Sequence, residues 1–215
     1  MFGVRAPDRH NGTVSSRPIF VRIRIDAPLD RVWELTQNPL EHPRWDGRFT
    51  SITPTEALPG GGTRFRYELR MPLHTIVGTG TTIGERHRAD GTCTSALRFD
   101  TDDWFSPLGA GRGYWRYEPD GDATIFTTGY DYAPRWGVLL DRLLLRRLIG
   151  WLTAWSFDRL RIWAERGIKP ERWPLWSALW VWRRDRPRAA RCVRDARGRR
   201  VMDAAPATLR TLEAP

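Results

Sequence analysis

The sequence predicts one α+β domain in which an antiparallel sheet of about seven strands packs against a long C-terminal helix. Three observations lead to this fold class. Residues 49–132 break into short runs of alternating apolar and polar residues, separated by turn signals. Residues 134–166 have a helical pattern, and one strand and two short helices come before the sheet. The 215 residues, 40% of them apolar, can bury one sizeable core.

The first strand is expected over residues 19–25, where isoleucine and valine alternate with two arginines as in a half-buried strand. Asp26-Ala27-Pro28 ends it. The helix that follows stops at Asn38-Pro39, because a residue before proline disfavours the α conformation. A second helical turn is expected at about residues 40–44.

Six further strands are expected between residues 49 and 132, joined by short turns. Asp90-Gly91 is a strong hairpin signal, and residues 104–111, which include Pro107, predict a longer loop. Short connections favour an antiparallel meander. After the first of these strands, which begins near Phe49, the expected ranges are 63–70, 74–87, 92–100, 112–118 and 124–132.

The last element is a helix expected to run unbroken from Pro134 to about Arg166, with Gly167 as its stop. Its apolar residues form a wide arc that needs a broad concave sheet beneath it. One stripe of this arc contains Leu140, Leu144, Leu148, Trp151, Trp155 and Ile162.

The opening of the chain resembles the START-like superfamily, also called SRPBCC. The resemblance lies in Ile23-Arg24-Ile25-Asp26-Ala27-Pro28, then Val32-Trp33, then Pro39 through Trp45-Asp46, and it extends over about residues 17–167. The superfamily includes polyketide cyclases and dehydrases, lipid-transfer domains and birch-pollen-allergen-like proteins. The resemblance implies a helix-grip fold, in which the curved sheet wraps around the C-terminal helix and leaves a ligand cavity between them.

The function implied by this resemblance is binding or carriage of a hydrophobic small molecule or lipid. Aromatic side chains on the expected inward faces suit a flat or bulky apolar ligand, although the same residues could fill the space as core. Tyr67 and Tyr130 are the first choices for polar contacts, because a buried tyrosine hydroxyl needs a partner. The expected ligand-binding residues are Phe65, Tyr67, Leu69, Trp115, Tyr117, Phe126, Tyr130, Leu148, Trp151 and Trp155.

A polyketide cyclase- or aromatase-type enzyme is the alternative function. Its candidate catalytic residues are Asp46, Tyr67, Asp131 and Arg147, because a carboxylate of raised pKa opposite a tyrosine could move protons at an enolisable carbon. Against this, Asp46 could be a turn residue and Arg147 could lie on the solvated side of the helix. We expect neither a cofactor nor a metal, because the four histidines have no ligand spacing and the two cysteines predict free thiols.

Composition divides the chain into a flexible leader at 1–16, the domain at 17–168 and an extension at 169–215. Most of the net charge of +10 belongs to the extension, where residues 183–200 hold nine Arg against two Asp. Four Trp in residues 173–182 come just before this run. On a helix, Trp173, Trp176 and Trp180 would share one side, next to Arg183 and Arg184.

Three partners for the extension remain open: an anionic membrane surface, the domain itself, and nucleic acid. Indole rings favour the membrane interface and clustered Arg attracts anionic lipid. Nucleic acid is disfavoured because no folded recognition motif accompanies the Arg run. With a mean hydropathy of −0.52, no long apolar run and no secretory signal, we expect a cytoplasmic protein, with peripheral membrane association as the alternative.

Overall fold

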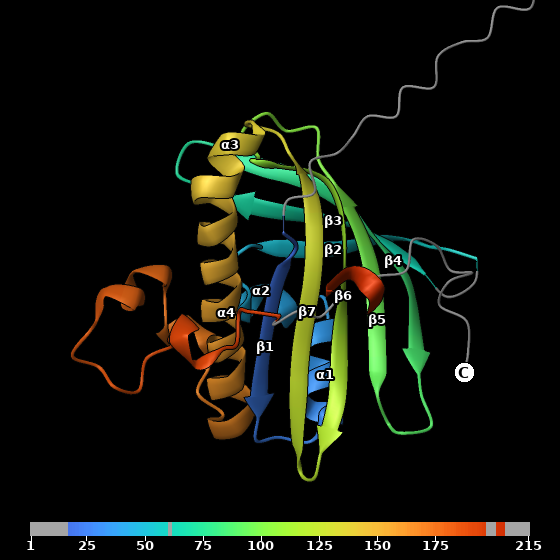
Figure 1. Ribbon diagram of the computed structural model, residues 1–215, viewed down its shortest axis with the longest axis vertical. Coiled ribbons are helices and arrows are strands. Elements are labelled where there is room, and N and C mark those ends of the chain that lie inside the picture. Colours follow the sequence, from blue (N-terminus) through green and yellow to red (C-terminus); the bar gives the residue numbers. More distant parts are fainter. Residues whose placement is uncertain (1–16, 60–61, 197–200, 205–215) are drawn as a thin grey trace, which may run out of the picture.

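Seven antiparallel strands form one sheet in the order β1-β7-β6-β5-β4-β3-β2. The computed structural model describes residues 17–59, 62–196 and 201–204. Figure 1 shows the sheet curving around the long helix α4, as the helix-grip prediction requires. The strands are β1 (Ile19–Ile25), β2 (Ser51–Ala57), β3 (Thr63–Arg70), β4 (Thr75–His87), β5 (Cys93–Asp100), β6 (Leu108–Asp120) and β7 (Ala123–Pro134).

The helices are α1 (Leu29–Gln37), α2 (His42–Trp45), α3 (Val138–Leu140) and α4 (Arg146–Arg166). The predicted start of the long helix at Pro134 was wrong, because β7 stays paired with β6 as far as that residue. Gly137 then turns the chain with a φ of 95°, and a π-helical turn at Asp141–Leu145 joins α3 to α4. The predicted loop at 104–111 was too long for the same reason, since β6 begins at Leu108.

The predicted apolar stripe of the helix is not continuous. Trp155 and Ile162 are buried in the core, but Leu140, Leu144 and Leu148 are exposed. The i→i+5 bonding of the π-helical turn shifts the phase of the residues before it relative to those after it. The upper part of the helix therefore turns leucines toward solvent.

The C-terminal extension packs along the outer side of α4. Asp158, fully buried on α4, accepts hydrogen bonds from the backbone N–H of Arg188 and from Arg191 Nη1, both at 2.7 Å. Farther on, Val193 exchanges two backbone hydrogen bonds with Arg22 on β1, the free edge strand of the sheet. The extension therefore covers both the lower half of α4 and part of an exposed strand edge.

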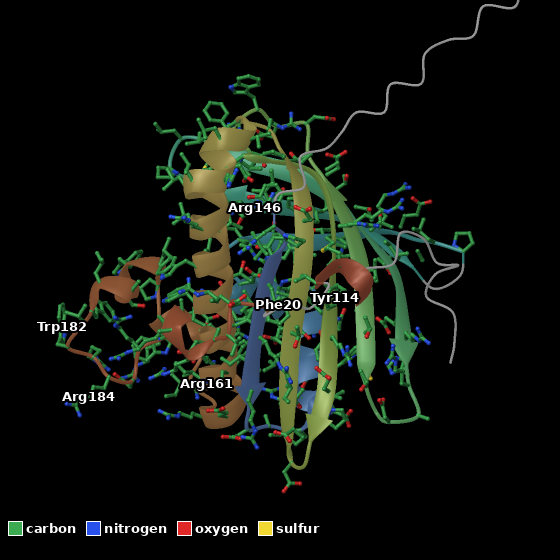
Figure 2. The ribbon with its side chains drawn as sticks, viewed as in Figure 1. Phe20, Tyr114, Arg146, Arg161, Trp182 and Arg184 are labelled. Atoms are coloured by element: carbon green, nitrogen blue, oxygen red, sulfur yellow. The ribbon has the colours of Figure 1, made fainter. Side chains whose placement is uncertain are left out.

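The outer face of the sheet carries apolar residues that the last described segment covers. Phe20 and Tyr114 point away from α4, yet both are buried. A turn at Val201–Ala204 lies over β7 here, and a Cβ added at Gly129 would approach Val201 to 2.8 Å. Figure 2 shows Phe20 and Tyr114 close to this turn. The leader predicted at 1–16 lies outside the described residues.

Candidate functional site

Aromatic rings line the concave face of the sheet, opposite α4. Strand register puts Trp115 and Tyr117 of β6 on the same face as Phe126 and Tyr130 of β7. The Tyr130 hydroxyl lies 2.8 Å from Thr153 Oγ1 on α4, which identifies this face as the one toward the helix. All four aromatic side chains are buried, so this half of the concave face is packed core.

The other half of the concave face is less covered. Phe65, Tyr67 and Leu69 of β3 share the concave face, yet all three are partly exposed. Their rings lean over glycines of β4: a Cβ at Gly78 would come within 2.2 Å of the Tyr67 ring, and one at Gly80 within 2.2 Å of the Phe65 ring. The glycines therefore allow the rings to lie close to the sheet, where they present flat apolar surface.

A charged cluster lies between these two halves, on α2 and the loop after it. Asp46 is completely buried and accepts hydrogen bonds from Arg48 Nη2 at 2.6 Å and from Arg48 Nε at 2.9 Å. His42 Nε2 lies 3.1 Å from Asp46 Oδ2. Because α2 is one turn long, residues 42 and 46 come onto the same side and the Asp46 carboxylate can hold both neighbours.

Burial and the charge of Arg48 together set the protonation states of this cluster. Burial alone would raise the pKa of Asp46, but the charge and hydrogen bonds of Arg48, with a smaller effect of His42, lower it well below its usual range. Burial lowers the pKa of His42 despite the nearby carboxylate. At neutral pH Asp46 is therefore ionised and His42 neutral, so His42 must donate its Nε2 proton to Asp46 and keep Nδ1 as an acceptor.

Aromatic rings surround the cluster. The Arg48 guanidinium lies 5.3 Å from the Tyr130 ring and 5.5 Å from the Phe49 ring, and Phe49 is 5.5 Å from the Tyr67 ring. Burial opposes the charge of Arg48, but Asp46 and Tyr130 raise its pKa above the usual value. Arg48 is therefore a permanent cation that borders the partly exposed aromatic half of the concave face.

The structure separates the predicted ligand-binding residues into three groups. Phe65, Tyr67 and Leu69 are partly exposed on the concave face, and Leu148 is exposed on the helix. Trp151 is partly exposed and stacks on Trp155, with ring centroids 6.5 Å apart. The remaining predicted residues are buried, namely Trp115, Tyr117, Phe126, Tyr130 and Trp155.

The four candidate catalytic residues do not form one site. Asp46 lies in the central cluster, and burial with the nearby Asp100 raises the pKa of Tyr67 to about 12. Asp131, by contrast, pairs at 2.7 Å with Arg146, which also binds the buried Asp141 at 2.8 Å. Arg147 is exposed. Arg147 therefore lies on the solvated side of the helix, the alternative that the sequence left open, and the arginine that the helix turns inward is Arg146.

The tryptophans that were predicted to form one docking surface on the extension differ in their exposure to solvent. The segment forms a short 3-10 helix at Leu175–Leu179, not the helix that would align three indoles. Trp173 is fully buried, with the Trp180 ring 6.4 Å away and the Arg183 guanidinium 5.6 Å from its centroid. Trp176 is exposed. Five apolar residues of this segment are exposed: Leu175, Trp176, Leu179, Val181 and Trp182.

His42 and Arg48 are the functional candidates that sequence reasoning missed. From the sequence alone, His42 is taken only with the other histidines, as a possible metal ligand, and Arg48 is given no role. The spacing that could have found them is a histidine four residues before Asp46 and an arginine two residues after it, among aromatic residues. Within the described residues, no cluster of three or more His, Cys, Asp or Glu side chains could hold a metal ion. Both cysteines are free thiols and both are buried.

A curved antiparallel sheet packed around a long helix defines the helix-grip class of domain. The chain belongs to the family described as polyketide cyclase / dehydrase and lipid transport, whose model matches residues 19–162. The resemblance inferred from the order of elements and from the opening residues is thus confirmed. The extension at 169–215 lies outside this match.

One relative is a Bacillus subtilis (strain 168) protein named uncharacterized membrane protein YndG. It is 39% identical over 170 residues, which are 77% of this chain and 63% of the relative, so the chain spans less than two thirds of the relative's length. Within the part of this chain that the structure describes, no helix is long and apolar enough to cross a membrane.

Two solved structures have the same fold at low identity. The STAR-related lipid transfer protein fragment from Xanthomonas axonopodis is 16% identical, with a TM-score of 0.51 over 70% of this chain and 88% of that one. The lipid transfer and protein localization domain of human StarD13 is also 16% identical, with a TM-score of 0.52 over 72% of this chain and 81% of that one. At this identity the likeness establishes the fold alone.

Proposed function

We propose that the protein binds an apolar small molecule or lipid that carries a hydrogen-bond acceptor, on the partly exposed half of its concave face. The observation that supports this is the Asp46–Arg48 pair buried among aromatic rings. A buried ion pair stabilises a fold little compared with apolar residues of similar volume. Such a pair beside partly exposed aromatic surface is better explained by a ligand than by packing.

Each part of the site has a role in this proposal. Phe65, Tyr67 and Leu69 contact the apolar body of the ligand. Asp46 occupies the Nε donor and one Nη2 donor of Arg48, and Tyr130 is a further hydrogen-bond partner of this guanidinium, so an acceptor oxygen on the ligand would take one of its remaining N–H donors. A carboxylate would suit this cation better than the neutral carbonyl of an ester, and a hydrogen bond between charged groups of this kind contributes about 1.5–3 kcal/mol.

The test uses a fluorescent fatty acid and its methyl ester. The double variant Asp46→Asn/Arg48→Gln removes both charges together, so it leaves no unpaired charge in the core. We expect it to bind the acid about 10- to 100-fold more weakly, and the ester nearly as well as the native protein does. Phe65→Ala should weaken both probes. Arg66→Gln, on the same strand but the opposite face, is the matched control.

Two results would contradict the proposal. Failure of the native protein to bind either probe would remove the ligand-binding function. Equal binding of acid and ester by all variants would remove the role of Arg48 while leaving apolar binding intact. A circular dichroism melt of each variant separates loss of binding from loss of folding.

Catalysis of a polyketide cyclase- or aromatase-type reaction at the same site is the second candidate function. The lowered pKa of Asp46 makes it a poor proton donor, contrary to the sequence-based expectation. Neutral His42, held by Asp46 with Nδ1 as acceptor, is the group suited to take a proton. In this case His42→Gln should abolish turnover of a linear polyketone surrogate without changing its binding. No turnover by the native protein would leave binding as the function.

Association with an anionic membrane surface through residues 170–200 is a further candidate function. The observation that favours it is the exposed apolar set of the extension, which includes Trp176 and Trp182, close to arginines such as Arg184. Figure 2 shows Trp182 and Arg184 at the outer tip of the extension, away from α4. Interfacial indoles and clustered arginines together suit a lipid headgroup region.

Cosedimentation with phosphatidylcholine vesicles, with and without phosphatidylglycerol, tests this candidate. Trp176→Ser/Trp182→Ser should weaken binding about tenfold, and salt should weaken it further because the Debye length is only about 10 Å at 0.1 M. Leu40→Ser, an equally exposed apolar residue on the loop between α1 and α2, is the control. Binding that is unaffected by the double Trp variant would exclude the extension as the docking surface.

A further inference from the structure

A second exposed apolar surface lies at the opposite end of the molecule from the turn between β6 and β7. Leu139 is 70% exposed, Leu143 58% and Trp104 74%, values far above those of core residues. We call this the apical surface. It contains Met71, Leu73, Trp104, Phe105, Trp136, Val138, Leu139, Leu140, Leu143 and Leu144.

Three connections that are far apart in the sequence form the apical surface, and side-chain bonds hold them together. His74 Nε2, in the β3–β4 turn, lies 2.8 Å from Asp103 Oδ2 in the β5–β6 loop, and the His74 ring is 4.4 Å from the Phe105 ring. Trp136, after β7, donates from Nε1 to the carbonyl oxygen of Trp104 at 3.0 Å. The exposed residues are therefore presented on a fixed surface.

The charges of α3 and α4 distinguish between possible partners. Arg142 and Arg147 are exposed on the same helical segment as the leucines. Between residues 136 and 157 the one acidic residue is Asp141, which is buried and bonded to Arg146. In a two-fold contact between two copies centred on these leucines, Arg142 of one would approach Arg147 of the other, and the helix supplies no free carboxylate to offset them. The acidic residues of the apical loops are Asp102 and Asp103, and Asp103 is bonded to His74. An anionic lipid surface accepts the same arginines and leucines without this repulsion.

We propose that the apical surface is a second membrane contact that inserts into the headgroup region of an anionic bilayer. The proposal rests on the membrane association proposed above for the C-terminal extension. It adds a second contact, at the apical end of the curved sheet. In Figure 1, α3 caps the upper end of α4 while the extension projects from the outer side of the same helix, so the sheet does not lie between the two surfaces. Leu69 and Phe99, partly exposed on the concave face, lie at the strand ends next to the apical loops. Docking here would bring that end of the concave face to the lipid.

The experiment places an environment-sensitive nitrobenzoxadiazole label on Leu143→Cys and, as control, on Asp122→Cys in the turn at the far end of the sheet. Both natural cysteines are buried, so labelling of the folded full-length chain favours the introduced thiol. With phosphatidylglycerol vesicles we expect a blue shift and increased emission at 143, quenching by lipids brominated near the headgroup, and no change at 122. Leu139→Ser/Leu143→Ser should weaken vesicle binding roughly tenfold.

The outcomes separate the two proposals. Vesicle binding with no change of the label at 143 would overturn the apical contact and leave the extension as the docking surface. Absence of vesicle binding would overturn both. A shift at 143 that appears without lipid and grows with protein concentration would identify a second copy as the occupant and also overturn the lipid contact. A melt of the Leu139→Ser/Leu143→Ser variant that matches the native protein excludes misfolding as the cause of weaker binding.

Discussion

Asp158 is predicted to be the main attachment point of the C-terminal extension, and Asp158→Asn tests this. Its buried carboxylate accepts three bonds of 2.7 Å, from Arg161 Nε, Arg188 N and Arg191 Nη1. Removing one partner of a buried ion pair costs about 3–5 kcal/mol. Two features reduce this cost: Arg161 keeps Glu165 at 2.5 Å, and Arg191 can turn to solvent. We therefore expect a loss of about 2–3 kcal/mol in the free energy of unfolding.

For a chain of this size, that loss corresponds to a fall of roughly 5–10 °C in Tm. The assay is thermal unfolding together with limited trypsin digestion, in which residues 183–194 should be cleaved faster in the variant. Asp185→Asn is the matched control, because Asp185 forms an exposed pair with Arg183 whose loss should change stability little. Equal Tm shifts and equal cleavage rates for the two variants would refute the attachment by Asp158.

Three further predictions concern the core. Between pH 6.5 and the lowered pKa of His42, the unfolded chain binds a proton that the folded chain does not. The free energy of unfolding should therefore decrease as the pH is lowered through this window, by up to about 1.4 kcal/mol per pH unit, and the pH dependence measured by urea titration should be flatter for His42→Gln. Gly80→Ala should lower the free energy of unfolding by about 1–3 kcal/mol, because the added methyl group would lie 2.2 Å from the Phe65 ring. Gly150→Ala should raise it by up to about 1 kcal/mol, because Gly150 lies in a helix and its added methyl group would have its nearest neighbour at 3.7 Å. Equal effects of the two variants in urea unfolding would contradict this prediction. Arg146→Met should lower the free energy of unfolding by about 3–5 kcal/mol, because it leaves the buried Asp141 without its ion-pair partner. Arg147→Met should lower it by less than about 0.5 kcal/mol, because Arg147 is exposed. Thermal melts that give the reverse order would show that the wrong arginine has been assigned to the core.

Local patterns predicted the strands well. The range expected for β1 matches the structure, and those for β3, β4 and β5 differ by at most one residue. Strand alternation and turn residues are local signals, so they can be read without knowing the fold. The ends of β6 and β7 were less predictable, because pairing between the two strands extends the ladder back to Leu108 and as far as Pro134. Pairing of this kind depends on the partner strand and not on the residue itself.

The site was predictable only in part. The inward positions of Phe65, Tyr67 and Leu69 follow from alternation, and the resemblance gave the face on which a ligand would bind. The cluster of His42, Asp46 and Arg48 was not predicted as a unit. Its members lie within seven residues, but only the burial of α2 against α4 and β6 excludes water and turns three ordinary polar residues into a fixed charged group.

The sequence by itself determined the class of fold, the order of its elements, and the separation of a nearly neutral body from an arginine-rich extension, because these depend on periodicity, turn residues and composition. The tertiary structure alone decided which arginine of the helix is buried, which tryptophans of the extension are exposed, and which apolar residues lie unpaired at the apical end. Arg146 and Arg147 are adjacent, so a change of helical phase by one residue decides which of them faces the core. The π-helical turn directly before them changes that phase. A sequence pattern read at a uniform 3.6-residue period cannot detect such a change, since it arises from how the helix meets the sheet.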